Sequence, residues 1–212
     1  MLKNIKWLGH STIKFEHMGK IIYVDPYKIK ENFLDADIIY ITHNHYDHFS
    51  KEDILKIKKD NTFIVITEDI YDKVIQLGFN KEKILSVIPN KEYEIEGIKF
   101  STVYAYNVNK EFHPKANNWV GYIILLDGIR YYIAGDTDKT LENEQVKCDV
   151  AFLPVGGTYT MNAREAVKLA ISINPKIVVP IHYGTLVGTI EDARYFKEQL
   201  KDKVECIIMK EL

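Results

Sequence analysis

The sequence has little of several features, and each absence limits what the protein can be. Only two of its 212 residues are cysteine, Cys148 and Cys206, and they stand far apart without a C-x-x-C spacing. This pattern predicts reduced thiols in the core rather than a disulfide framework or a zinc knuckle. The longest apolar run, near residues 120–126, is far shorter than the ~20 residues that a membrane-spanning helix needs.

An excess of charge of one sign is also missing. The chain has 28 basic and 30 acidic side chains, and its lysine clusters are interleaved with acids, as in residues 51–60. This is typical of a solvated helix face and gives no footprint for nucleic acid. The first ten residues lack the apolar core of a signal peptide, so we expect a cytoplasmic protein. As partner we expect a small-molecule substrate, with no membrane and no nucleic acid, and the composition leaves a homo-oligomer open.

No linker rich in proline, glycine or serine divides the chain, and its length suits one domain over residues 1–212. Periodicity and turn residues predict its regular elements. In the first half these are strands at 4–9, 11–17, 20–27, 38–41 and 62–67, a hairpin over 92–106, and helices at 51–60 and 68–78. The first three strands should form an antiparallel meander, and Ser50 should cap the first helix.

The second half repeats this order. A hairpin ends at Asp136 as an earlier one ends at Asp25, and residues 36–55 align without a gap with residues 148–167. Each half is too small to bury both faces of its sheet, so we expect sheet to pack against sheet with helices outside. The prediction is an α/β (α+β) chain folded as an αββα sandwich of two mixed β-sheets flanked by helices. Its two similar halves are predicted at about 1–105 and 106–212.

Three of the seven histidines fall within "ITHNHYDHFS", residues 41–50. His43 and His45 are two apart at the end of an extended run and point to one side, while Asp47 and His48 follow on a loop that can turn back. Imidazole and carboxylate together suit zinc, iron or manganese, and four such groups exceed what one catalytic metal takes from protein. We therefore predict two metals. The alternative, a cluster of capping hydrogen bonds, would bury adjacent histidines at a high cost in free energy.

The run His43-x-His45-x-Asp47-His48 after an apolar strand resembles the signature of the metallo-β-lactamase-fold hydrolases. The similarity continues through "GDTD" at 135–138 and "IHYG" at 181–184, each after a strand, and so extends over the whole chain. The resemblance implies the metallo-β-lactamase fold as one domain.

The resemblance also implies a ligand set. In the superfamily the two histidines of H-x-H and a third one downstream hold the first metal, which here gives His43 and His45. Carried over by position, the second metal would be held by Asp47, His48 and His182. Asp136, after its glycine, would bridge the two metals.

The third histidine of the first metal departs from the superfamily pattern. Members place it just after the strand that here ends in "STVYAYN", where this chain has Asn107. The only histidine between His48 and Asp136 is His113. Either His113 completes the first site from its loop, or Asn107 and water fill the gap. A third alternative is that His113 is an exposed loop histidine before a proline.

Two further stretches, "WLGHST" and "PVGGTYTM", resemble small metal-dependent hydrolases related to the ascorbate-lactone hydrolase branch. This resemblance brings His10 to the rim of the metal site, as a substrate contact or leaving-group proton donor. Its alternative is a turn histidine bonded to backbone. Tyr159 aligns with Asp47 in the repeat and, like Asn107, is a candidate substrate contact. The glycine pair Gly156-Gly157 has no side chains and would let the backbone approach a ligand closely.

These residues predict a hydrolase that uses a metal-activated hydroxide to cleave an ester, lactone or phosphodiester bond. Two divalent cations, zinc first with manganese or iron as alternatives, would lower the pKa of a shared water from about 15.7 toward neutrality. Asp47 would orient the hydroxide and accept its proton. The cations outweigh the two aspartates in charge, so we expect an anionic substrate. The alternatives are a diiron redox enzyme, a nuclease, or a structural metal site, although structural zinc favours thiolate ligands.

Overall fold

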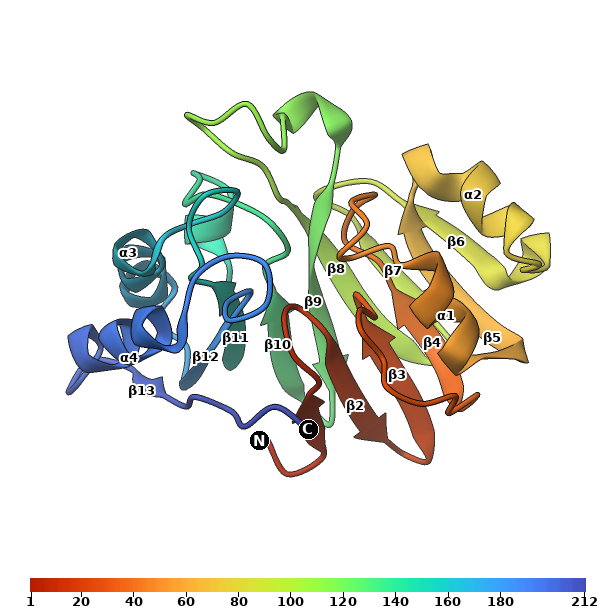
Figure 1. Cartoon of the computed structure of the whole chain (residues 1–212), viewed down its shortest axis with the longest axis horizontal. Helices are drawn as coiled ribbons and strands as arrows, with labels where there is room; N and C mark the ends of the chain where they lie inside the picture. Colours follow the sequence, from red (N-terminus) through yellow and green to blue (C-terminus); the bar gives the residue numbers. More distant parts are fainter. The chain divides into compact units, whose positions relative to one another are not determined.

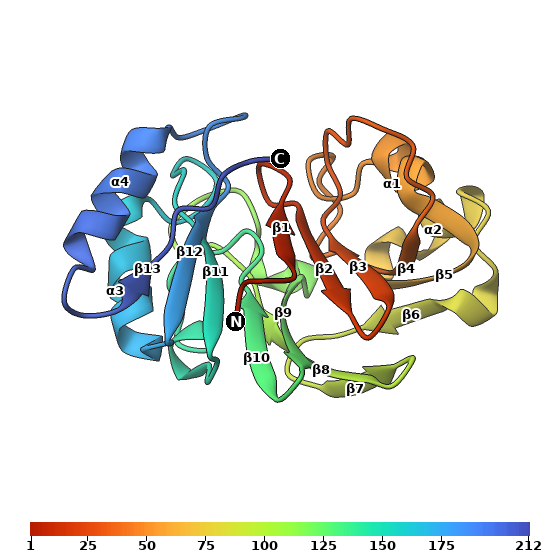
Figure 2. The same cartoon turned by 90° about the horizontal axis from the view of Figure 1, so that it is seen from below.

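The computed structural model describes all residues, 1–212, and they form two compact units. The first unit comprises Met1–Ile88 together with Lys210–Leu212, and the second comprises Pro89–Met209. Each unit contains one β-sheet and two α-helices (Figures 1 and 2). The assignment of residues 1–212 to a single domain stays a prediction.

The sheet of the first unit has six strands in the order β1-β2-β3-β4-β5-β6. Their bounds are β1 (Ile5–Trp7), β2 (Ile13–His17), β3 (Lys20–Val24), β4 (Ala36–Tyr40), β5 (Lys58–Thr67) and β6 (Ile84–Val87). The strands β1 to β3 are antiparallel, which confirms the predicted meander, and β3 to β6 run parallel. In β4 every side chain except that of Asp37 is buried, as is typical of a parallel strand inside a sheet.

Two α-helices, α1 (Lys51–Ile57) and α2 (Tyr71–Gln76), lie along this sheet (Figure 1). Ser50 caps α1 as predicted, because its hydroxyl accepts a hydrogen bond from the Asp53 amide at 3.3 Å. The helix ends at Ile57 and not at the predicted residue 60, because Lys58 already pairs with Ala36 of β4. The second predicted helix begins as a 3-10 turn over 68–70, and β6 was not among the predicted strands.

The second unit contains a seven-stranded sheet in the order β13-β12-β11-β10-β9-β8-β7. Its strands are β7 (Glu92–Ile95), β8 (Ile98–Tyr104), β9 (Val120–Leu126), β10 (Ile129–Ile133), β11 (Val150–Pro154), β12 (Ile177–Ile181) and β13 (Glu205–Cys206). The strands β7 to β10 are antiparallel and β10 to β13 are parallel. The helices α3 (Ala163–Ile173) and α4 (Ile190–Gln199) lie beside β11, β12 and β13 (Figure 2). A capping box of Asn162 and Glu165 starts α3.

The same order of elements occurs in both units. A hairpin (β2–β3 or β9–β10) is followed by a strand, a helix, a strand, a helix and a strand, with the last three strands parallel to the hairpin's second strand. The units divide after residue 88, so β7 and β8 belong to the second one, where β8 pairs with β9. The prediction of an α/β (α+β) chain with two mixed sheets and flanking helices is confirmed.

This topology decides where polar side chains gather. The parallel strands β3 and β4 have their carboxyl ends on the same side of the first sheet, and the chain runs from them directly to Asp25 and, three residues after Tyr40, to His43. In the second unit β10 and β12 lead in the same way to Asp136 and His182. None of the four α-helices combines the length and the apolar character needed to cross a bilayer.

Candidate metal centre

The first group of candidate ligands lies on the loop after β4. His43 Nε2 is 3.2 Å from His45 Nδ1, and His48 Nε2 is 3.4 Å from Asp47 Oδ2. The amides of His48 and Phe49 both donate to the His45 carbonyl, at 3.0 and 2.7 Å, and so turn the loop back as predicted. His43, Asp47 and His48 are buried. The four residues of the motif are therefore brought together.

A buried carboxylate that the sequence analysis did not assign to the site holds this loop. Asp25 accepts hydrogen bonds from the Thr42 amide at 2.8 Å, the Thr42 hydroxyl at 2.7 Å and His48 Nδ1 at 2.7 Å. The Thr42 hydroxyl uses its one proton on Asp25, so it accepts from His43 Nδ1 at 2.9 Å. Both histidines thus carry their proton on Nδ1, which leaves the lone pair of Nε2 for a metal. The available signal was that a hairpin ends at Asp25 as a later one ends at Asp136.

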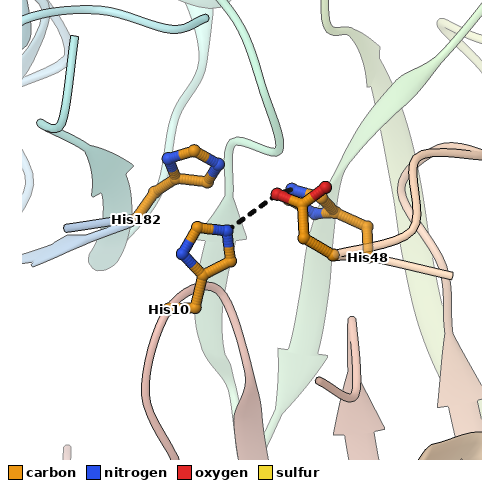
Figure 3. Close-up of side chains that lie close together, drawn as sticks. His10, His48 and His182 are labelled. Atoms are coloured by element: carbon orange, nitrogen blue, oxygen red, sulfur yellow. Dashed lines mark hydrogen bonds and ion pairs between the residues drawn. The ribbon is translucent and has the colours of Figure 1, made fainter. Parts of the chain in front are cut away.

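His10 lies against the same loop. Its Nε2 is 2.8 Å from Asp47 Oδ2 (Figure 3, dashed line), and its ring is buried. The indole of Trp7 donates to the His10 carbonyl at 2.9 Å and fixes the turn. The structure therefore places the ring on the Asp47 carboxylate and away from solvent. Its roles as substrate contact and proton donor stay predictions.

The second unit brings together three more of the predicted ligands. Asp136 Oδ2 lies 3.2 Å from His182 Nε2 and 3.3 Å from His113 Nε2, and all three side chains are buried. One oxygen of Asp136 thus lies within ligand spacing of two imidazole nitrogens. That these residues and those of the first group share one pair of metals stays a prediction.

His113 is only 1% exposed, so the alternative of an exposed loop histidine is wrong. Two anchors hold its loop. The backbone N–H of Asn107 donates a hydrogen bond to the backbone carbonyl of His113 at 2.9 Å. Further along, the Lys115 ammonium lies 4.9 and 4.8 Å from the ring centres of Tyr104 and Tyr106 and pairs with Glu142. The loop that carries His113 is therefore tied to β8 at one end and to Glu142 at the other.

The predicted substrate contacts are placed differently from one another. The Asn107 side chain is buried, and its Nδ2 lies 2.7 Å from the Tyr159 carbonyl oxygen and 3.2 Å from His113 Nδ1. The Tyr159 ring is 37% exposed and packs edge-on against Phe112, with ring centres 4.7 Å apart. A Cβ on Gly156 would lie 2.2 Å from the His182 carbonyl oxygen. The absence of a side chain at this position therefore makes room for the backbone of His182 and not for a ligand.

Four of the residues just described have left-handed backbones, with φ of +47° at His10, +45° at Asp25, +57° at His113 and +56° at His182. For side chains with a Cβ this conformation costs about 1–2 kcal/mol. Strain of this kind persists where the surroundings hold it, and it gathers at functional sites. The same conformation occurs at turns elsewhere in the chain, such as Met18 and Asn174, so at these four positions it shows that the surroundings hold the backbone and does not by itself mark a function.

The spacing of the donor atoms fits divalent cations. Tetrahedral ligands at zinc distances of about 2.0–2.1 Å keep their donor atoms about 3.3 Å apart. The pairs His43–His45, Asp47–His48, Asp136–His182 and Asp136–His113 are separated by 3.2, 3.4, 3.2 and 3.3 Å. Both thiols lie outside the site as buried, free cysteines, and burial raises the pKa of each to about 12. The donor set is therefore imidazole and carboxylate, as catalytic metal sites use.

Comparisons with known proteins agree with this chemistry. Residues 4–182 match the family model of the β-lactamase superfamily domain. A UPF0173 metal-dependent hydrolase of Thermococcus onnurineus is 36% identical over 97% of this chain and 96% of its own length. A crystal structure of a candidate metal-dependent hydrolase from Parabacteroides distasonis is 33% identical, with a TM-score of 0.83 over 98% of this chain and 92% of that chain.

The structure of Igni18, a metallo hydrolase from Ignicoccus hospitalis, is 25% identical, with a TM-score of 0.79 over 97% of this chain and 94% of that chain. Together with the sheets and helices described above, these likenesses confirm the predicted metallo-β-lactamase fold. The chain belongs to the β-lactamase superfamily and, within it, to the UPF0173 metal-dependent hydrolases.

Proposed function

We propose that this metal-dependent hydrolase cleaves an ester, lactone or phosphodiester bond of an anionic substrate and uses two divalent metal ions, zinc first. The observation that carries the proposal is the set of four donor pairs with the spacing of a cation's ligands, in a family of metal-dependent hydrolases. The proposed ligands are His43, His45 and His113 for one ion and Asp47, His48 and His182 for the other, with Asp136 between them. When bound, the ions would supply Lewis acidity and lower the pKa of water toward neutrality.

The protein's own residues then have separate tasks. Asp25 holds the ring of His48, and Thr42 holds the ring of His43. Each hydrogen bond is made by Nδ1 of the ring, so that Nε2 stays available. Asp47 orients the attacking water and accepts its proton. His10, bonded to Asp47 at 2.8 Å, holds this carboxylate and passes the proton that Asp47 has accepted on to the leaving oxygen.

The finer assignments rest on the sequence. The resemblance of "WLGHST" and "PVGGTYTM" supports kinship with the ascorbate-lactone hydrolase branch. Buried, unpaired thiols support a cytoplasmic location. We include a small-molecule substrate, contacted by Asn107 and Tyr159, and no membrane or nucleic-acid partner; the near balance of charges supports this choice and leaves a homo-oligomer open.

The test combines metal content with turnover. Elemental analysis of protein purified without added metal should give two equivalents in wild type and fewer in His45→Ala. Turnover of a chromogenic ester, a lactone and a phosphodiester should fall about 10²-fold or more in Asp47→Asn. His17→Ala, at a strand end away from the motif, is the control. Full activity in metal-free protein would end the proposal, and iron with oxygen-dependent turnover would favour the redox alternative.

A further inference from the structure

The side-chain amide of Asn107 is fixed in one orientation. Its Nδ2 lies 2.7 Å from the Tyr159 carbonyl oxygen, and a carbonyl oxygen can only accept a hydrogen bond. The amide nitrogen, and not Oδ1, must therefore face Tyr159. The second hydrogen of the same nitrogen is directed at His113 Nδ1, 3.2 Å away.

This orientation determines where His113 carries its proton. Because the Asn107 nitrogen has only donors to offer, the ring nitrogen that faces it must accept. A neutral imidazole whose Nδ1 accepts has its proton on Nε2, and this Nε2 faces Asp136 Oδ2 at 3.3 Å. A metal needs the lone pair of Nε2, so His113 in this tautomer is not ready to bind one through that atom.

His48 shows the opposite arrangement in the first unit. Its Nδ1 faces a carboxylate, Asp25, at 2.7 Å, so the proton sits on Nδ1 and Nε2 keeps its lone pair. Carboxylate and carbonyl acceptors behind a ligating histidine are the usual arrangement in metal sites. A donor in that place, as Asn107 provides behind His113, reverses the preference.

Rotating the Asn107 amide would not resolve the conflict. With Oδ1 toward His113 the ring could carry its proton on Nδ1, but an oxygen would then face the Tyr159 carbonyl at 2.7 Å. We propose that Asn107 is a positioning residue that holds His113 in the Nε2–H tautomer, so that His113 binds its metal more weakly than Asp47, His48 and His182 bind theirs. The inference rests on the proposed function for the identity of the two metal sites. The tautomer itself can be tested without a metal.

The first experiment is ¹⁵N nuclear magnetic resonance of the histidine side chains in metal-free protein. The His113 signals, identified by their loss in His113→Gln, should show the Nε2–H form in wild type. They should move toward the Nδ1–H form in Asn107→Ala, which removes the donor, and further in Asn107→Asp, whose carboxylate accepts from the ring while its other oxygen moves away from the Tyr159 carbonyl. An Nδ1–H or doubly protonated ring in wild type would overturn the inference.

The second experiment is competition of the protein with a chromophoric chelator for Zn²⁺. Wild type should bind two equivalents unequally, and Asn107→Asp should tighten the weaker one about 10- to 100-fold without changing the stronger one. Asn107→Ala, which removes the donor without adding charge, should tighten it less, and serves if the aspartate variant does not fold. Asn117→Asp, on the same loop but exposed, adds the same charge and should change neither equivalent. Unchanged binding in both Asn107 variants would refute the inference.

The two experiments separate failure of the inference from failure of the proposed function. If His113→Gln keeps both equivalents of zinc, His113 is not a ligand, and the metal assignment of the proposed function is wrong. The tautomer measured in metal-free protein would still stand or fall independently. If wild type binds no metal at all, the proposed function fails as a whole.

Discussion

The carboxylate of Asp25 lies 2.7 Å from Nδ1 of His48, with both side chains fully buried. The same carboxylate accepts from the amide and the hydroxyl of Thr42. Three donors on one buried carboxylate fix the start and the end of the histidine loop to the end of β3. Asp25 therefore decides the tautomer of His48 and, through Thr42, that of His43.

Replacing Asp25 should weaken metal binding although Asp25 is not a proposed ligand. In Asp25→Ala we expect affinity for Zn²⁺ to fall about 10- to 100-fold, as is usual when the acceptor behind a ligating histidine is lost. The unpaired Thr42 amide should also cost about 1–3 kcal/mol of stability. Chelator competition and urea denaturation measure the two effects. Asp35→Ala removes a carboxylate paired with Lys14 in the same unit and should leave zinc affinity intact. Wild-type affinity in Asp25→Ala would contradict the prediction.

His10 can be separated into its two proposed tasks, holding Asp47 and giving up a proton. The two variants that separate these tasks, His10→Ala and His10→Gln, should both retain two metals. In His10→Ala both tasks are lost, and kcat should fall about 10²- to 10⁴-fold. In His10→Gln the amide can still donate to Asp47 but cannot deliver a proton to a leaving group. We therefore expect His10→Gln to be as slow as His10→Ala on substrates with a poor leaving group. On substrates with a good leaving group it should be faster. If His10→Gln exceeds His10→Ala by the same factor on both kinds of substrate, His10 only holds Asp47 and delivers no proton.

Gly156→Ala should disturb the site through the backbone of His182. The new methyl group would meet the His182 carbonyl oxygen at 2.2 Å, and the φ of +56° at His182 leaves little freedom to move aside. We expect a loss of about 1–3 kcal/mol in stability and weaker binding of the metal assigned to His182. Gly97→Ala is the comparison, because its Cβ meets nothing within 4 Å and only the turn is strained. Lower stability with intact metal affinity would indicate that His182 is not a ligand.

The sequence was sufficient wherever the necessary contacts are local. His43, His45, Asp47 and His48 lie within six residues, so a short loop alone brings them together. Asp25 was missed because its role depends on the pairing of β3 with β4. This pairing brings the Asp25 amide to the Tyr40 carbonyl at 3.0 Å, two residues before Thr42. Only the comparison of the two hairpins, one ending at Asp25 and the other at Asp136, drew attention to it.

The same distinction applies to the fold. Strands with clear alternation or a long apolar run, such as β2 and β9, were predicted, whereas the short edge strands β6 and β13 were not. Helix propensity predicted that α1 continues to residue 60. Because Lys58 pairs with Ala36 of β4, residues 58–60 form the start of β5 instead. The burial of His113 was equally beyond a single sequence, because its ring contacts Trp119 and Asp136, which other segments of the chain supply.

Acid should loosen the loop that carries His113 before it unfolds the protein. Burial raises the pKa of the Glu142 carboxyl, but hydrogen bonds from Lys115 and Tyr106 lower it by more than burial raises it. The net result is a pKa below the ordinary value of 4.5. A group with a lowered pKa stabilises the fold above its ordinary pKa, and this contribution is lost as the pH falls below it. When the pH is lowered from about 6 to about 3.5, the free energy of unfolding measured with urea should therefore fall more in wild type than in Glu142→Gln. Hydrogen exchange over 107–118 should rise in parallel in wild type and be fast at both pH values in the variant. Equal losses in the two proteins would mean that Glu142 does not anchor the loop.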